Sequence, residues 1–292
     1  MERKWRLALA EINERFYRRQ AAEFSGSRGR PWPGWERVLD RVVGSWTGSS
    51  EGNAPSAASP PTEDGASRRA LDVGCGNGRF GALLAQRFDA GKMSYVGVDG
   101  SGELLLDAES ALEDLGWAQL RLLPWDWVTQ DARLPGELSS GELSSEETMD
   151  LVVLFGSLHH VPGAELRRNL LLTLARQLAP GGWLVVSVWR FGEDARFRRR
   201  FLPWSKSGEI TGVAVDERVL DPGDHLLAWG PLPQGDAGGQ ESPARYCHAL
   251  QKPEEDRLLT ELQELGLELV ETFEDDGRGR QLNGYWMLRR RA

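Results

Sequence analysis

Leu71-Asp72-Val73-Gly74-Cys75-Gly76-Asn77-Gly78 decides the fold of this chain. The apolar start of the stretch predicts a buried β-strand, and the three glycines predict a sharp turn into a helix. Glycine has no Cβ and tolerates positive φ, so such a backbone can turn tightly and approach a ligand closely. Asp72 places a carboxylate near the strand end, where a cationic group of a ligand could bind. The alternative is an ordinary strand–turn–helix corner in which the glycines serve packing alone.

The spacing of the glycines separates two kinds of nucleotide-binding turn. A dinucleotide fingerprint, G-x-G-x-x-G/A, requires a small residue at position 79, where helix and strand pack closely. This chain has Arg79 there, which disfavours a nicotinamide dehydrogenase. The pattern that remains, D-x-G-x-G-x-G, resembles motif I of the class I S-adenosylmethionine-dependent methyltransferases. In that family the acid at the position of Asp72 lies close to the methionine amino group of the cofactor.

Acidic residues follow the next two predicted strands. Residues 95–99 predict a strand that ends in Asp99, where a carboxylate can accept hydrogen bonds from both hydroxyls of a ribose. Asp-Gly-Ser is also a good turn sequence, so a turn aspartate is the alternative. Residues 120–127 predict a third strand and its exit. By the resemblance, Asp126 would meet the adenine amino group and Trp127 would pack on the adenine ring; a loop aspartate beside a core tryptophan is the alternative.

The apolar run 149–155 predicts a fourth strand that is covered on both faces. The residues after it, 156–162, match the family's fourth motif, a loop beneath the methyl donor. His159 and His160 lie in this loop, and open α/β sheets bind ligands outside the carboxyl ends of their strands. We expect one histidine to face the cofactor pocket and the other to face the core or solvent; the sequence leaves open which. No metal site is predicted, because adjacent side chains diverge and no ligand cluster accompanies them.

Later elements complete the expected fold. Further helices are predicted at 170–178 and 254–265, and further strands at 183–189, 267–273 and 285–289. Two late strands are what the class I methyltransferase fold uses to finish its sheet. We therefore predict an α/β protein: a Rossmann-like, doubly wound sheet of seven mostly parallel strands, with an N-terminal helical lid.

Composition limits the class of protein. The chain has 292 residues, two cysteines and a formal net charge of −9. The low cysteine count makes a disulfide framework unsuited to it and predicts a reducing, cytoplasmic location. The sequence shows neither a signal peptide nor an apolar run of transmembrane length, so no membrane association is expected. The negative charge argues against a broad nucleic-acid-binding face. Two basic clusters, 196–200 and 289–291, could meet phosphates or form a solvated face.

Three segments divide the chain. Residues 44–67, 134–147 and 230–243 are rich in small and polar residues and predict linkers or solvated excursions. Residues 4–24 carry apolar residues at helical spacing and predict an amphipathic helix that caps the core. The expected domains are an N-terminal helical lid at 1–43, a flexible linker at 44–67 and a methyltransferase core at 68–292. An insertion is expected at about 191–244.

Two further segments sharpen the resemblance. Residues 16–33 follow the pattern F-Y-x-x-x-A-x-x-F-S-x-[ST]-R-x-x-x-W-P, and Arg245-Tyr246-Cys247-His248 follows far downstream. Both are similar to segments of the tRNA wobble-uridine methyltransferases, which esterify a carboxymethyl group on uridine 34. Trp229 could supply a tryptophan that this family carries upstream of the second segment.

The resemblance assigns roles to individual residues. The predicted catalytic and substrate-binding residues are Arg28, His160, Arg245, Tyr246 and His248. The predicted cofactor-binding residues are Asp72, Gly74, Cys75, Gly76, Asn77, Gly78, Asp99, Gly100, Asp126, Trp127, Gly156 and His159. Arginine pairs bidentately with carboxylate or phosphate, so Arg28 and Arg245 would hold an anionic substrate, and Trp32 could stack on a base. The alternative is that both arginines fix the lid to the core and that Trp32 is a core residue.

The cofactor implied is S-adenosylmethionine, and the leading predicted function is methylation of a carboxymethyl group on a tRNA wobble uridine or a related RNA. The partners implied are tRNA and a small activating protein. A carboxylate acceptor would need no general base. The alternatives are a small-molecule O- or N-methyltransferase and a cofactor-binding subunit without activity of its own, against which the intact Asp72, Asp99 and glycine set argues.

Overall fold

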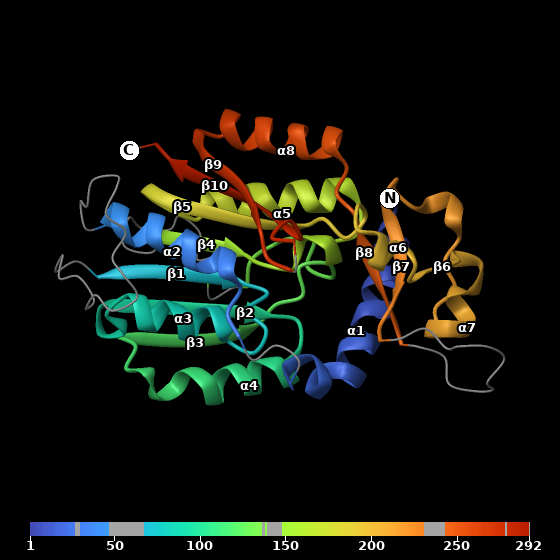
Figure 1. Ribbon diagram of the computed structural model, residues 1–292, viewed down its shortest axis with the longest axis horizontal. Coiled ribbons are helices and arrows are strands. Elements are labelled where there is room, and N and C mark those ends of the chain that lie inside the picture. Colours follow the sequence, from blue (N-terminus) through green and yellow to red (C-terminus); the bar gives the residue numbers. More distant parts are fainter. Residues whose placement is uncertain are drawn as a thin grey trace.

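The computed structural model describes residues 1–26, 30–46, 67–135, 138, 148–230, 243–277 and 279–291. Within these residues a seven-stranded sheet has the order β3-β2-β1-β4-β5-β10-β9, and a second sheet has the order β6-β7-β8. Figure 1 shows the strands of the large sheet side by side, with the small sheet and helix α1 beyond one end of them. This is the predicted Rossmann-like methyltransferase architecture, and the fold prediction is confirmed.

Five neighbouring strands of the large sheet are parallel to one another. They are β1 (Arg68–Val73), β2 (Met93–Asp99), β3 (Gln119–Pro124), β4 (Met149–Leu154) and β5 (Leu178–Trp189). β10 (Asn283–Arg290) is antiparallel to both β5 and β9 (Leu267–Asp275). Asp72 lies opposite Gly97 of β2 and Val153 of β4. Because β1 is central and parallel to both neighbours, the loops after β1, β2 and β4 meet at one edge.

Strand β5 begins earlier than predicted. The preceding helix, α5 (Ala164–Arg176), ends before the Pro-Gly-Gly segment, and Leu178 already pairs with Met149 of β4. The register then shifts between Met149 and Leu151. Gly181 has φ +76°, a conformation that glycine adopts readily, so residues 180–182 form a kink within the strand.

Helices cover both faces of the large sheet. α2 (Pro33–Trp46), α3 (Arg79–Arg87) and α4 (Gly102–Leu112) contribute to one core cluster, rich in aromatic side chains such as Trp35 and Phe80. α5 and α8 (Lys252–Glu264) contribute leucines to the cluster on the other face. None of the helices in the described residues is long and apolar enough to cross a membrane.

Helix α1 (Arg3–Gly26) joins the small sheet to the large one (Figure 1). The small sheet consists of β6 (Phe201–Leu202), β7 (Asp224–Ala228) and β8 (Ala244–His248), and two short helices, α6 (Ala195–Arg198) and α7 (Ser207–Thr211), lie in the same region. Leu9 and Ile12 of α1 pack in one cluster with Leu226 and Tyr246. The apolar face of α1 is therefore buried against the small sheet, which leaves its opposite face free to cover a ligand.

The N-terminal region, predicted to be a single lid, consists of two helices with different structural roles. α1 extends over the sheet edge, whereas α2 packs its apolar side into the core beneath β9 and β10. The expected linker begins within α2, since residues 44–46 are helical, and its residues 47–66 lie outside the described residues. Most of the segments 134–147 and 230–243 also lie outside them. The expected insertion corresponds to the small sheet, which extends to His248.

A buried carboxylate connects the start of α2 to the C-terminal hairpin. Asp276 is 4% exposed and has φ +69°. It accepts hydrogen bonds from the Gly34 backbone N–H (3.0 Å), from Asn283 Nδ2 (2.8 Å) and from the Tyr285 hydroxyl. Removing the carboxylate would leave three buried donors without their acceptor.

Replacing Asp276 with alanine is therefore expected to lower the free energy of unfolding by about 2–4 kcal/mol. Urea denaturation followed by circular dichroism measures it. Asp256→Ala, which removes a carboxylate from an exposed ion pair with Lys252, is the matched control and should change stability by less than about 0.5 kcal/mol. Equal effects of the two variants would contradict this role.

Candidate active site

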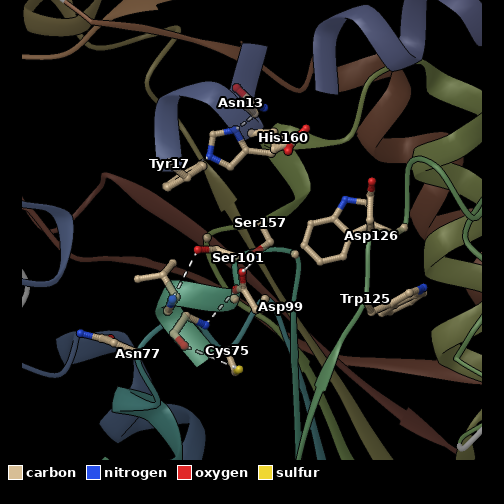
Figure 2. A pocket seen from close by; sticks show the side chains of 18 of the residues that line it. Asn13, Tyr17, Cys75, Asn77, Asp99, Ser101, Trp125, Asp126, Ser157 and His160 are labelled. Atoms are coloured by element: carbon tan, nitrogen blue, oxygen red, sulfur yellow. Dashed lines mark hydrogen bonds between the residues drawn. The ribbon is translucent and has the colours of Figure 1, made fainter. Parts of the chain in front are cut away.

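A pocket of about 920 Å³ lies at the carboxyl ends of β1 to β4, beneath α1 (Figure 2). Its floor consists of the loops after the four strands, and its cover consists of the polar side of α1 together with Trp32 and Trp35. Figure 2 shows Asn13, Tyr17 and His160 together on one side, with Cys75 and Asp99 on the other. The sequence prediction that ligand binds at this edge of the sheet agrees with the position of the pocket.

The three glycines of the turn have different structural roles. Gly74 has φ +72°, and a Cβ there would lie 2.0 Å from Ser157 Oγ. Gly76 has φ +54°, and a Cβ there would meet nothing within 4 Å, so its backbone borders open pocket space. Gly78 has φ +77° and packs against Leu112 of α4 without lining the pocket. The first two glycines shape the ligand cradle, and the third lets α3 pack close to α4.

Asp99 is fixed at the pocket wall by the glycine turn. Its Oδ2 accepts a hydrogen bond from Gly76 N–H (3.0 Å), and its Oδ1 accepts one from Ser101 N–H (2.8 Å). Burial raises the pKa of Asp99, and these backbone N–H groups oppose that shift. Each oxygen keeps a second lone pair, so the carboxylate can accept two hydroxyl donors, as the ribose role requires.

Asp72 is 2% exposed and accepts a hydrogen bond from the Tyr95 hydroxyl (2.6 Å). Burial raises the pKa of Asp72 to about 7, whereas the Tyr95 bond and the nearby Arg79 guanidinium lower it. Arg79 also lines the pocket and lies over the Trp35 ring, 5.2 Å from its centroid. A cationic group bound beside Asp72 would favour its charged form, as the predicted contact with an amino group requires.

Asp126 and Trp127 both line the pocket. Asp126 Oδ1 accepts a hydrogen bond from the Val128 backbone N–H (2.9 Å), so this carboxylate also holds the turn after β3. The Trp127 ring meets Trp125 edge to face, with 5.9 Å between ring centroids. Both residues stand where the predicted adenine contacts place them, and that role stays a prediction.

The structure distinguishes the two histidines. Both lie in the 3₁₀ helix η4 (Leu158–His160), and only His160 lines the pocket. His159 is 9% exposed and its ring lies 4.8 Å from that of Trp189, so the predicted cofactor contact of His159 is not supported. The expectation that the two side chains diverge is wrong, because their ring centroids are 4.1 Å apart.

Cys247 lies beside the two histidines, with the three potential ligand atoms within 4.8 Å of one another. Burial raises the pKa of the Cys247 thiol to about 11, despite the Arg245 guanidinium beside it. His160 already uses both ring nitrogens in hydrogen bonds. A neutral thiol next to a guanidinium is a poor site for a cation, so we do not assign these residues as metal ligands.

The second predicted motif is not part of the pocket wall. Arg245 is 4% exposed, Tyr246 is fully buried, His248 is 1% exposed, and none of these three lines the pocket. Their strand, β8, is covered by α1 on one side and by Phe191 and its neighbours on the other. This position corrects the expectation that they touch the substrate. Arg28 lies outside the described residues.

Tyr246 and His248 belong to a buried polar network. The Tyr246 hydroxyl donates to Asp224 Oδ1 (2.8 Å), and His248 Nδ1 lies 2.7 Å from the same oxygen. His248 Nε2 lies 3.1 Å from Glu254 Oε2, and the fully buried Arg167 donates to Glu254 Oε1 (2.7 Å). This network connects β7, β8, α5 and α8. It positions the small sheet that supports α1.

The pocket includes residues to which the sequence analysis gave no role, above all Asn13, Tyr17 and Ser157. Asn13 and Tyr17 are four residues apart in a helix, so both project from the same face. The sequence analysis predicted an amphipathic helix that caps the core and gave this polar face no role. The available signal was the four-residue spacing of these two polar residues, the second of which, Tyr17, is in the quoted Phe-Tyr segment.

Comparison with known proteins agrees with this geometry. Residues 71–184 match the family model described as a methyltransferase domain. Residues 71–184 of the chain are therefore similar to a methyltransferase domain. The matched residues include the glycine turn, Asp99, Asp126 and both histidines, so the match covers the floor of the pocket.

Individual relatives share the fold. A trans-aconitate 2-methyltransferase from Azoarcus sp. (strain BH72) is 30% identical over 154 residues, which are 52% of this chain and 51% of that protein. The match therefore spans about half the length of this curated relative. A methyltransferase structure from Methanosarcina mazei has a TM-score of 0.50 and 20% identity, covering 77% of this chain and 93% of that one. An amino pentose methyltransferase from Micromonospora echinaspora has a TM-score of 0.50 and 21% identity, covering 92% and 95%.

These findings agree, over residues 71–184 and in the fold, with the predicted methyltransferase class and its cofactor, S-adenosylmethionine. The residues present fit that cofactor: Gly76 leaves open space for close approach, Asp99 offers two acceptor oxygens, and Asp72 is a buried carboxylate that a cation would stabilise. The tRNA wobble-uridine family is not among these findings.

Cofactor affinity is expected to depend on pH through Asp72. The free carboxyl has a pKa of about 7, while an α-amino group is cationic below about 7.7–8.0. Affinity for S-adenosylmethionine should therefore rise between pH 5 and pH 7, by up to about tenfold per unit. Isothermal titration calorimetry measures it. Asp72→Asn should bind more weakly at pH 7.5 and show a flat profile, whereas the exposed Asp114→Asn should match the wild type; a flat wild-type profile would refute this assignment.

The buried Asp72 carboxyl should also lower the free energy of unfolding of the protein without cofactor. Its pKa is raised from 3.8 to about 7 on folding, so the folded state binds more protons and stability falls as pH rises through this window. Asp72→Asn keeps an acceptor for Tyr95 and removes the buried charge. It should raise the free energy of unfolding at pH 8 by about 2–4 kcal/mol, with the gain disappearing towards pH 4, as measured by urea denaturation.

Proposed function

We propose that this protein transfers a methyl group from S-adenosylmethionine to a small-molecule acceptor. The observation that carries the proposal is the pocket itself: at about 920 Å³ it has the size of a small-molecule site, and α1 covers it. A ring from Trp32 lies against Gly156, since a Cβ there would be 2.9 Å from the Trp32 ring. That position makes Trp32 part of the cover beside the methyl donor, rather than a free platform for a base.

The charge of the lining supports an uncharged or cationic acceptor. Among the described residues, six acidic side chains line the pocket, against two arginines, Arg18 and Arg79. The acidic residues are Glu11, Glu14, Asp72, Asp99, Glu103 and Asp126. Arg18 is paired with Glu14, and Arg79 lies near Asp72, so neither offers a free cation. This lining disfavours polyanions, which include both RNA and the substrate in the name of the Azoarcus relative.

The predicted tRNA substrate has less support than a small-molecule acceptor. Arg245 is buried behind the pocket wall, and Arg28 lies outside the described residues. In the basic cluster, Arg196 is paired with Asp194. The tRNA substrate, the activating partner protein and the cytoplasmic location stay predictions from the sequence, and the experiment below includes tRNA as one arm.

Residues of this chain would hold the cofactor at defined places. Asp99 would accept the ribose hydroxyls, Asp72 would face the amino group, and Trp127 would pack on the adenine. The cofactor supplies an electrophilic methyl group when it is bound. α1 and Trp32 exclude water from the methyl end and hold the acceptor in line, and positioning of this kind supplies much of the rate enhancement in group transfer.

The proposal is tested with labelled S-adenosylmethionine and four groups of acceptors: small amines, small alcohols and phenols, small carboxylates, and total tRNA from cells lacking the gene. Label is expected in a small amine or hydroxyl compound. Asp99→Ala should weaken cofactor binding at least tenfold and lose transfer in proportion, and Asp114→Asn should retain both. Label in tRNA alone would overturn the proposal.

A further inference from the structure

Arg245 is a buried cation whose surroundings are unusual. Its guanidinium lies among the rings of Phe16, Trp189 and Trp229, 5.1–5.4 Å from their centroids. Its NH1 donates a hydrogen bond to the Tyr17 hydroxyl (3.2 Å). Among the described residues, no carboxylate forms an ion pair with it, although buried charges are normally paired. The positive charge therefore acts on the two polar groups beside it, the Tyr17 oxygen and the Cys247 thiol.

Tyr17 connects the Arg245 guanidinium to the pocket. Arg245 does not line the pocket, whereas Tyr17 does. The Tyr17 hydroxyl lies 2.7 Å from His160 Nε2, and His160 also lines the pocket (Figure 2). The phenol oxygen thus lies between a guanidinium and an imidazole, at a surface that an acceptor can reach. Among the described residues, the titratable groups in contact with it include His160 from η4 and Arg245 from β8, and Cys247 lies beside Arg245.

The surroundings of His160 prepare it to receive a proton from Tyr17. Its Nδ1 lies 3.1 Å from the Tyr246 carbonyl oxygen, so an Nδ1–H can donate to that oxygen. Nε2 then presents its lone pair to the Tyr17 hydroxyl. Asn13 fixes the strand that carries this carbonyl, because its Oδ1 accepts a hydrogen bond from the Tyr246 backbone N–H (2.9 Å). β8 therefore contributes its backbone as well as Arg245.

We propose that Tyr17 is the catalytic proton acceptor of this site and that Arg245 is the positioning residue that stabilises negative charge on its oxygen. The proposal rests on the proposed function and narrows its substrate class to compounds with a nucleophilic hydroxyl or amine. The acceptor atom forms a bond to the methyl carbon as the carbon–sulfur bond of the donor breaks, its electron pair remaining on sulfur. The acceptor proton goes to the Tyr17 oxygen, and the Tyr17 proton goes to His160 Nε2. A carboxylate acceptor carries no proton, so its methylation would not need these two proton transfers.

Tyrosine ionisation tests the proposal without any substrate. The chain has four tyrosines, and the other three, Tyr95, Tyr246 and Tyr285, are buried and bonded to carboxylates. Burial raises the pKa of each of these three. NMR of protein labelled at the tyrosine Cζ should show one signal ionising at lower pH than the others, and Tyr17→Phe should remove it.

Arg245 variants show whether the guanidinium sets this titration. In Arg245→Met, which keeps an apolar side chain among the three rings, the Tyr17 signal should ionise at least one pH unit higher. Arg245→Lys should preserve most of the effect, and Tyr246→Phe should leave it unchanged. A Tyr17 signal that ionises no earlier than the other tyrosines, or that does not move in Arg245→Met, would refute the proposal.

The second test is steady-state kinetics with an acceptor that the labelling experiment above has identified. Tyr17→Phe should lower kcat about 10²-fold or more while KM and S-adenosylmethionine affinity stay within about twofold. Turnover of the wild type should rise with pH, because protonation of the Tyr17–His160 pair at low pH removes the proton acceptor. If no tested acceptor is methylated, the proposed function fails while the NMR titration still decides the state of Tyr17. If the acceptor is a carboxylate, the proposed proton relay is wrong.

Discussion

The positive φ angles of Gly74 and Gly76 are the constraint on which the site depends. They turn the chain away from β1 within two residues and direct the Gly76 N–H to Asp99 at the end of β2. Any side chain at position 74 would collide with Ser157, which belongs to the loop after β4. One turn therefore fixes the relative positions of three loops, and those loops make up most of the pocket floor.

The cover of the pocket depends on a second, independent assembly. α1 contributes little to the main core; it is held by the small sheet, whose strands β7 and β8 are tied to α5 and α8 by the network around Asp224 and Glu254. The polar face of α1 is thereby presented to the pocket with Asn13 and Tyr17 already paired to β8 and His160. The insertion after β5 thus acts on the pocket through α1, without lining it.

Much of the floor could be predicted from the sequence, because each residue there follows a strand whose apolar pattern is local. Asp72, Asp99, Asp126 and Trp127 all line the pocket where strand ends were expected. The cover could not be predicted in the same way. Arg245 was assigned to the substrate from its motif, yet β8 is covered on both sides, which places its guanidinium behind Tyr17 rather than in the wall. The choice between His159 and His160 depends on which ring nitrogen α1 and β8 can reach.

The sequence by itself determined the class of fold, the strand-end glycine turn and the acidic residues that follow the strands, because these depend on periodicity and on the backbone freedom of glycine. The tertiary structure alone decided which side chains cover the pocket. That decision requires α1 and β8, which are more than two hundred residues apart, to bring Tyr17, His160 and Arg245 together. Local patterns carry no record of such a contact, since it arises from packing two separate sheets on opposite sides of one helix.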